Sequence, residues 1–389
     1  MAVSSSSYRR RIIRSIAEIP ANAWDALAGE DYPFLRHAFL LALEESGCTT
    51  AKTGWQPLHL LLTREEEEEP CAALPLYLKS HSMGEYVFDW SWADAYRRHG
   101  LEYYPKLVSA VPFTPCAGPR VLSSVDDPAL LPQLYKEVLS LARELDASSW
   151  HVLFPDAATC EALCAQGALR RMGCQYQWFN QNYSSFEHYL ESFSSRKRKN
   201  LRKEREKVYG AGITFEHVEG ADIDAELWST FYDFYASTYY VRGRMPYLNL
   251  DFFQRVGRTM PERLLLVLAI REGRPIAGAL YFKGSDTLYG RYWGCTEEAQ
   301  FLHFETCYYQ GIDYCIRHGI RRIDSGAQGE HKIQRGFKPV PTWSAHWIAH
   351  PDFRRAIAHF VAEEEEHIQG YLQHASEYLP FRKDLEIRA

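Results

Sequence analysis

Long hydrophobic runs, paired cysteines and a strong net charge are all missing from this sequence. No stretch approaches the roughly 20 uninterrupted apolar residues that a membrane-spanning helix needs, so we expect no membrane span. The nine cysteines have neither the paired spacing of a disulfide framework nor histidine partners for zinc, which favours reduced thiols, a cytoplasmic setting and no bound metal. With a formal net charge of -6, the surface as a whole does not predict nucleic-acid binding.

What the chain does have is the composition of a folded protein with more than one domain. Its 389 residues are 46% hydrophobic and 14% aromatic. This length corresponds to roughly two to three domains, each large enough to bury its own core.

The N-terminus allows two interpretations. Four serines followed by four arginines between residues 9 and 14 are typical of a transit peptide. The apolar pattern of Ile12, Ile13 and Ile16 instead predicts a first strand, followed after Pro20 by a helix. We favour the strand.

Two stretches separated by about two hundred residues share one pattern, and such self-similarity is typical of duplicated architecture. Residues 60–79 and 266–283 each predict an apolar strand, a turn that opens with Arg-Glu, and a second strand that ends in lysine. After each we expect a third, aromatic-rich strand, at 86–90 and at 287–293. An amphipathic helix and a short strand then follow in both halves, at 130–145 and 150–154 and again at 303–318 and 321–325.

The repeat predicts an α/β protein with mixed sheets and two related domains. We expect the first domain at residues 1–182, with an aromatic insertion at 85–128. The second domain spans 183–349 and opens with a basic helix. Residues 350–389 predict a pair of C-terminal helices that pack across the junction.

The aromatic insertion is too long for a simple connection, which favours a lid or a binding element. Asp89, Trp90 and Asp94 lie among its aromatic residues. Aromatic walls with a few charged groups are typical of a ligand pocket, so we expect these residues to bind substrate. An ordinary aromatic core with a charged rim is the alternative.

The basic helix carries eight lysines and arginines between Ser194 and Lys207 against two glutamates. On a helix the basic side chains form rows along one side, a pattern that fits a row of phosphates. A solvated helix face is the alternative. The residues that we expect to contact phosphate or nucleic acid are Arg198, Lys199, Arg202, Lys203 and Arg205.

A dense polar segment follows the predicted strand at 321–325. Glu330 and His331 supply a base and a proton relay, while Lys332 and Arg335 supply anion-binding groups and Gln328 a neutral hydrogen-bonding group. Ligand sites concentrate at the carboxyl ends of strands in such sheets, which favours a site here over a plain solvated loop.

The basic helix opener, the hairpin at 286–294, the helix that begins at 303 and the loop at 326–332 resemble the predicted N-acyltransferases of the FemAB-like group. In the first half, residues 54–55, 75–79 and 84–90 resemble the same branch, so that the resemblance covers nearly the whole chain. It implies two tandem GNAT-like folds. It also implies, by analogy with FemX-like relatives, transfer of an amino acid from aminoacyl-tRNA to an amine on a peptidoglycan precursor.

Acyl transfer to an amine needs a group that takes the amine proton and donors for the developing oxyanion. GNAT folds supply such donors where two neighbouring strands separate, which we expect around Tyr289, Arg291 and Trp293 in the second half. The candidates for the proton acceptor are Asp89, Glu305, Glu330 and His331, and the sequence does not choose among them. We interpret His303 as a histidine at the edge of the core.

The sequence has no glycine-rich loop of the kind that binds the pyrophosphate of coenzyme A in GNAT enzymes. In the second half this place holds Glu297 and Glu298, which would repel phosphate, and in the first half Pro119 removes one amide donor. We therefore expect no tightly bound cofactor and favour aminoacyl-tRNA as the donor and an amine-bearing small molecule or peptide as the acceptor. The alternatives are an acyl-CoA or acyl-carrier-protein donor, and a non-catalytic module that recognises a cell-wall peptide.

Overall fold

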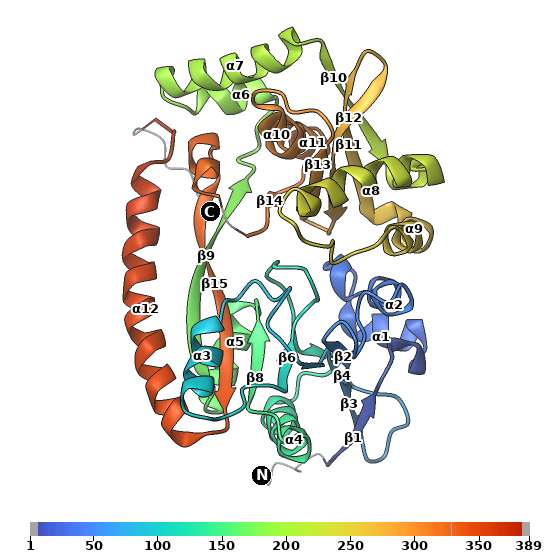
Figure 1. Cartoon of the computed structure of the whole chain (residues 1–389), viewed down its shortest axis with the longest axis vertical. Helices are drawn as coiled ribbons and strands as arrows, with labels where there is room; N and C mark the ends of the chain where they lie inside the picture. Colours follow the sequence, from blue (N-terminus) through green and yellow to red (C-terminus); the bar gives the residue numbers. More distant parts are fainter. Residues whose placement is uncertain (1–6, 328, 383–389) are drawn as a thin grey trace. The chain divides into compact units, whose positions relative to one another are not determined.

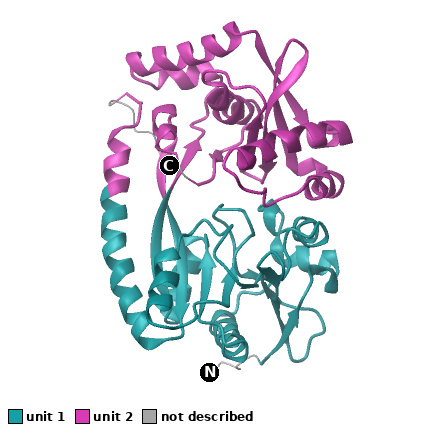
Figure 2. Ribbon diagram, in the orientation of Figure 1, with its two compact units in different colours: residues 1–174, 341–370 teal, residues 175–340, 371–389 magenta. Residues whose placement is uncertain are grey.

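The computed structural model describes residues 7–327 and 329–382, which form two compact units (Figures 1 and 2). Unit 1 comprises Met1–Cys174 and Pro341–Gly370, and unit 2 comprises Gln175–Val340 and Tyr371–Ala389. The domains expected from the sequence follow the order of the chain, whereas each unit also takes a segment from the C-terminal part. Three elements run from one unit into the other: β9 (Leu169–Phe179), β15 (Lys338–Ile348) and α12 (Pro351–Glu377).

Unit 1 contains two sets of paired strands. The first is antiparallel, in the order β1-β3-β4-β7, with β1 at Tyr8–Ile13, β3 at His59–Arg64, β4 at Ala72–Leu74 and β7 at Leu122–Ser123. The second runs β15-β8-β6-β5-β2, with β8 at Ser149–Leu153, β6 at Lys106–Ser109, β5 at Tyr77–Lys79 and β2 at Trp55–Pro57. In the second set β6 and β8 are parallel, and the other neighbours are antiparallel.

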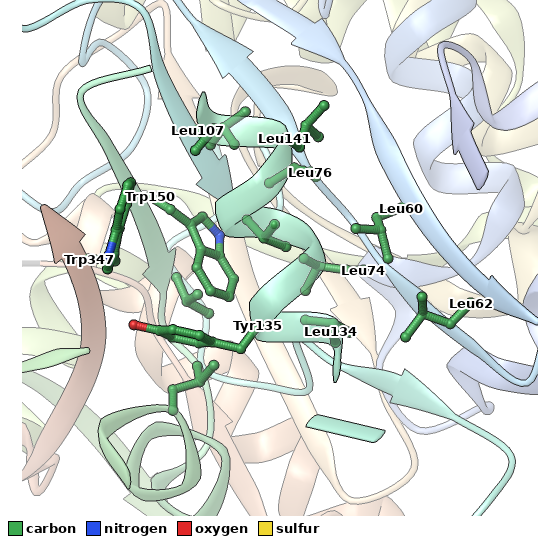
Figure 3. Packing of buried hydrophobic residues seen from close by; sticks show 14 of the residues in the cluster. Leu60, Leu62, Leu74, Leu76, Leu107, Leu134, Tyr135, Leu141, Trp150 and Trp347 are labelled. Carbon is green, nitrogen blue, oxygen red and sulfur yellow. The ribbon is translucent and has the colours of Figure 1, made fainter. Parts of the chain in front are cut away.

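The helices of unit 1 cover both faces of the second set of strands. On one face, α4 buries Leu134, Tyr135 and Leu141, whose spacing forms an apolar helical stripe, against Leu107 and Trp150 (Figure 3). On the other face, Trp92 and Tyr96 pack with Ile348 and with the first part of α12. The helical segments of this unit are η1 (Ile16–Glu18), α1 (Ala21–Ala28), η2 (Pro33–Leu35), α2 (His37–Glu45), α3 (Trp90–Arg98), α4 (Leu130–Glu144) and α5 (Ala157–Ala165).

Unit 2 has one sheet in the order β10-β11-β12-β13-β14-β9, with β10 at Ile213–Glu219, β11 at Leu264–Arg271, β12 at Arg274–Lys283, β13 at Thr287–Cys295 and β14 at Arg322–Asp324. The neighbours β13 and β14 are parallel and the others are antiparallel. Its helical segments are α6 (Phe186–Glu191), α7 (Ser195–Gly210), η3 (Gly220–Asp222), α8 (Ala225–Tyr240), α9 (Leu250–Thr259), η4 (Pro261–Arg263), α10 (Leu302–Phe304), the π turn η5 (Glu305–Tyr309), α11 (Gln310–His318) and η6 (Glu330–Arg335).

The two units repeat one topology, as the sequence predicts. In each, a first strand and two helices lead to an antiparallel hairpin and a further strand, and a helix then leads to a strand that pairs in parallel with it. The last strand of each sheet comes from the other half of the chain, since β15 pairs with β8 in unit 1 and β9 pairs with β14 in unit 2. The predicted duplication is therefore confirmed, with an exchange of final strands that no repeat pattern reveals.

Three local predictions are wrong. The aromatic strand expected at 86–90 is absent. Helix α3 begins at Trp90 and buries Trp92 and Tyr96, which lie four residues apart on one face. The strand of unit 1 that corresponds to β13 of unit 2 is β6. The insertion at 85–128 is consequently not a long loop but contains α3, β6 and β7. The two C-terminal helices are one continuous helix, α12. At the N-terminus, β1 and the helix α1 confirm the interpretation as a strand followed by a helix.

Candidate functional site

The parallel strands β13 and β14 of unit 2 part after a short contact. In the described chain their ladder runs from Thr287 and Arg322 to Tyr289 and Asp324, while β13 itself continues to Cys295. On its other side, the register between β12 and β13 shifts so that Arg291 is an extra residue between the pairs made by Gly290 and Tyr292. Such a bulge bends its strand and redirects the backbone groups beside it. The place where we expect oxyanion donors thus coincides with a bulge and a strand separation.

The segment that follows β14 is fixed by its own buried polar groups. Asp324 is 1% exposed, and its Oδ1 accepts a hydrogen bond from the Gly326 amide at 2.9 Å. Burial raises the pKa of the Asp324 carboxyl above its ordinary value. Lys332, at 2% exposure, donates to the carbonyls of Ser325 at 3.0 Å and Gly326 at 3.3 Å. Lys332 therefore holds this segment in place, and the predicted substrate-binding residue Gln328 lies outside the described residues.

Two histidines and three aromatic rings form a cluster beside the separation of the strands. The Tyr308 hydroxyl lies 3.0 Å from Nε2 of His331, and the ring centroid of His303 lies 6.1 Å from that of His331. Trp293 touches His303, with 5.2 Å between centroids, and Phe304 lies 5.3 Å from His331.

These histidines are held in the neutral form. Burial, together with His331, Lys332 and Arg335, lowers the pKa of His303 to about 4. Burial and the same two cations lower the pKa of the exposed His331 below its ordinary value. A neutral imidazole at the surface of this cluster is able to accept a proton.

In unit 2, the predicted functional residues Glu305, Arg205 and Arg335 instead form largely buried ion pairs. Glu305, fully buried in the π turn, accepts hydrogen bonds from Arg205, whose guanidinium also reaches Asp313 at 2.9 Å. Burial raises the pKa of Glu305 despite this cation. Arg335 donates to both carboxylate oxygens of Glu204 at 2.9 Å and lies 3.4 Å from the centre of the Phe304 ring. These groups stabilise the packing of the surrounding helices.

The basic helix α7 has a different exposed side from the one that the sequence predicts. Arg205 is engaged with Glu305, Arg202 pairs with Glu187, and Arg198 is half-buried. The residues whose spacing forms an exposed row are Arg196, Lys199, Lys203 and Lys207. Of the five predicted phosphate-binding residues, only Lys199 and Lys203 belong to this row.

The three candidates from the insertion in unit 1 have separate environments. Asp89, 2% exposed, accepts hydrogen bonds from Lys106 and from the Tyr103 hydroxyl. Trp90 is 48% exposed, and Asp94 pairs with Arg97 and Arg98 on the surface of α3. In unit 2, Glu330 is exposed and accepts a hydrogen bond from Tyr371 at 2.8 Å, while Tyr289 is buried in the sheet.

Sequence reasoning does not identify His303 and Tyr308 as parts of this cluster, or Asp324 as the residue that fixes the segment after β14. His303 was interpreted as a core-edge histidine, and Tyr308 meets His331 because the π turn changes the usual helical spacing. A single apolar-periodic pattern gives no signal for a π turn. Asp324 lies near the end of a predicted strand, and the available signal is its position two residues before Gly326, whose amide donates a hydrogen bond to it.

The family model FemAB_like, described as peptidoglycan biosynthesis/recognition, matches residues 15–383. No curated protein matches the chain significantly.

Among solved structures the chain is similar to FemX, at 14% identity and a TM-score of 0.53, over 90% of this chain and 100% of that one. It is also similar to the C-terminal domain of a protein described as a lysylphosphatidylglycerol synthetase from Agrobacterium fabrum, at 11% identity and a TM-score of 0.54, over 88% and 96% of the two chains. These likenesses and the repeated strand order confirm the expected fold of two tandem GNAT-like units. No helix in the part of the chain that the structure describes is long and apolar enough to cross a bilayer.

Proposed function

Because the chain belongs to the FemAB_like family of peptidoglycan biosynthesis/recognition proteins, we propose that it is an N-acyltransferase that moves an acyl or aminoacyl group from an activated carrier to an amine. A peptide or peptidoglycan precursor is the acceptor class that the family supports. The observation that carries the proposal is the separation of β13 from β14 at the Arg291 bulge, beside the neutral imidazole of His331.

In the proposed reaction the amine nitrogen attacks the carbonyl carbon of the donor, the new C–N bond forms, and the bond from that carbon to the carrier oxygen or sulfur breaks. Backbone donors along the bulge of β13 stabilise the oxyanion that develops on the carbonyl oxygen. His331 takes the proton from nitrogen and passes it to the departing oxygen or sulfur of the carrier. In the tautomer whose Nε2–H donates to Tyr308, Nδ1 is the proton acceptor.

The environments of the four candidate bases favour His331. Glu305 is fully buried and ion-paired with Arg205, and the Lys106 ammonium faces Asp89 in the other unit. Glu330 is exposed but lies next to the cluster rather than in it, with its carboxylate bonded to Tyr371. His331 is exposed, neutral and in contact with the aromatic groups that border the strand separation.

We further propose that the donor is an aminoacyl-tRNA whose phosphates contact the exposed row Arg196, Lys199, Lys203 and Lys207 of α7. The segment after β13 supports this choice over coenzyme A, because Glu297 and Glu298 are both exposed there. Arg271 pairs with Glu297, so Glu298 leaves an acidic rather than a phosphate-binding surface.

The test is a transfer assay on the full chain with aminoacyl-tRNA, acyl-CoA and acyl-carrier protein as donors and a lysine-containing peptidoglycan peptide as acceptor. Mass spectrometry of the acceptor should find the added group with aminoacyl-tRNA. Transfer only from a thioester would exclude the tRNA donor while keeping the reaction type.

A non-catalytic recognition module is the second candidate, favoured by the engagement of Glu305 and Arg335 in buried ion pairs. Saturable binding of the peptide without turnover from any of the three donors would support this module and contradict the enzyme.

A further inference from the structure

A buried ionic network lies in unit 1, on the face of the sheet opposite the core built on α4. Trp150 and Trp347 belong to that core, so the residues next to them in sequence, His151 and His346, point to the other face. There the Lys106 ammonium, fully buried, donates to Ser82 at 2.8 Å, to Glu85 Oε2 at 2.8 Å and to Asp89 Oδ2.

The network extends in both directions from Lys106. Tyr103 donates to Asp89 Oδ2 at 2.6 Å and lies 3.2 Å from His151, whose Nδ1 is 2.6 Å from that of His346. On the other side, the fully buried Lys79 lies 3.9 Å from Glu85 Oε1 and 3.6 Å from the centre of the Trp55 ring.

The fold does not require this network. Lys283 ends the matching strand in unit 2, and there it pairs with Glu219 at the surface, with side chains that are 20% and 43% exposed. Buried ion pairs seldom stabilise a protein more than apolar residues of the same volume would, because each charge loses its hydration. The corresponding sheet of unit 2 folds without such a network. A role in function therefore explains the network better than a role in stability does.

One oxygen of each carboxylate in the network accepts no hydrogen bond. Among the described residues, Glu85 Oε1 and Asp89 Oδ1 have no hydrogen-bond partner, although Glu85 is 4% and Asp89 2% exposed. The indole N–H groups of Trp55 and Trp92 at the borders of the network lack partners as well. Two buried carboxylate oxygens without donors carry a large desolvation cost, which a ligand with N–H groups removes.

We propose that Glu85 and Asp89 form a binding site for a primary ammonium group in unit 1. This inference rests on the proposed function only in identifying the natural ligand as the acceptor, which enters this site with an ammonium group other than the amine that attacks the donor in unit 2. A primary ammonium has three N–H donors, one for each open oxygen and one to spare. The segment that carries Glu85 and Asp89 also presents Phe88 and Trp90, which are 53% and 48% exposed, as apolar contacts for the rest of the ligand.

The charge of the network sets the pH dependence of binding. Burial lowers the pKa of Lys79 to about 7 and raises that of Glu85 to about 7. Lys106 and Asp89 remain a charged pair, so above pH 7 the network gains negative charge and attracts a cation, whereas below pH 7 it repels one. The other titratable or charged groups around it are His81, Tyr103, Tyr104, His151, Arg171 and His346.

The test is an NMR titration of the full chain, with 15N label in its tryptophan indoles. One titration uses methylammonium, and the other uses tetramethylammonium, which has no N–H group. We expect saturable shifts of the Trp55 or Trp92 indole signals with methylammonium alone, and an affinity that rises at least tenfold from pH 6 to pH 8. Glu85→Gln and Asp89→Asn should weaken methylammonium binding at least tenfold, and the exposed matched control Glu102→Gln should not.

Equal binding of both cations, or no saturable shift in the unaltered protein, would overturn the site. The two oxygens would then be hydrogen-bonded by ordered water only. The comparison of the two cations needs no variant, so it decides even where Glu85→Gln fails to fold. Binding is measured without a donor. Amine binding without any transfer would contradict the proposed function alone, and transfer without amine binding would contradict this site alone.

Discussion

At the scale of the residue, two histidines that look alike in the sequence have different positions around one ring cluster. His303 is largely buried, with its pKa lowered to about 4, whereas His331 is exposed and hydrogen-bonded to Tyr308. A buried neutral imidazole fills space, and an exposed neutral imidazole exchanges protons with a ligand. The assignment of the base to His331 follows from this difference.

We expect His331→Asn to reduce kcat/KM for transfer by about 10²–10⁴-fold, the usual contribution of a positioned base, while the melting temperature stays nearly constant. Steady-state kinetics and thermal unfolding measure the two effects. His367→Asn, at an exposed position on α12, is the control. Unchanged turnover in His331→Asn would assign the proton acceptor to another group.

For Glu305 we expect the opposite result, a loss of stability without a loss of turnover. Because its carboxylate is buried against Arg205, Glu305→Gln leaves a guanidinium with a weaker partner and should lower the free energy of unfolding by on the order of 3 kcal/mol. Urea denaturation measures this loss. Turnover per folded molecule should stay near that of the unaltered enzyme, and a large loss of turnover with normal stability would restore Glu305 as a catalytic residue.

At the scale of the element, helix α7 separates its charges into two sides. Arg202 and Arg205 are engaged by carboxylates of unit 2, and the row from Arg196 to Lys207 faces outward. The sequence predicts the helix and its positive charge, but the choice of side depends on Glu187, Glu305 and on how α6 and α11 pack.

The outward row predicts a change in salt dependence. The double variant Lys199→Ala, Lys203→Ala should weaken tRNA binding. It should also reduce the slope of the logarithm of the association constant against the logarithm of the salt concentration by roughly 1 to 2, because each phosphate contact releases counterions. Filter binding at several salt concentrations measures the slope. Lys136→Ala, on the exposed side of α4, is the matched control, and an equal effect there would point to unspecific attraction.

The elements that the sequence predicts correctly have a local cause. The hairpin β11–β12 and the strand β13 follow from apolar runs separated by turn residues, and both halves repeat that pattern. The start of helix α3 is predicted as a strand, because the run Tyr86-Val87-Phe88 shortly before Trp90 obscures the helical spacing of Trp92 and Tyr96. The π turn, the bulge at Arg291 and the partners of Arg205 depend on contacts between distant residues, for which one sequence contains no pattern.

At the scale of the whole molecule, the order of strands limits how the chain can be divided. A fragment of residues 1–174 lacks β15, the neighbour of β8, and should expose the backbone groups of that strand. We expect the fragment to associate or to remain unfolded, because an open hydrophobic edge pairs with other chains. Size-exclusion chromatography and circular dichroism measure this outcome, and a folded monomer would contradict it.

The exchange of β9 and β15 also bears on the order in which the protein is made. A ribosome releases β8 long before β15, because residues 154–337 lie between them. Throughout that interval the sheet that contains β8 has an unpaired border, and it becomes complete only when β15 has emerged. During that interval we therefore expect the nascent chain to need protection of this border from neighbouring polypeptides.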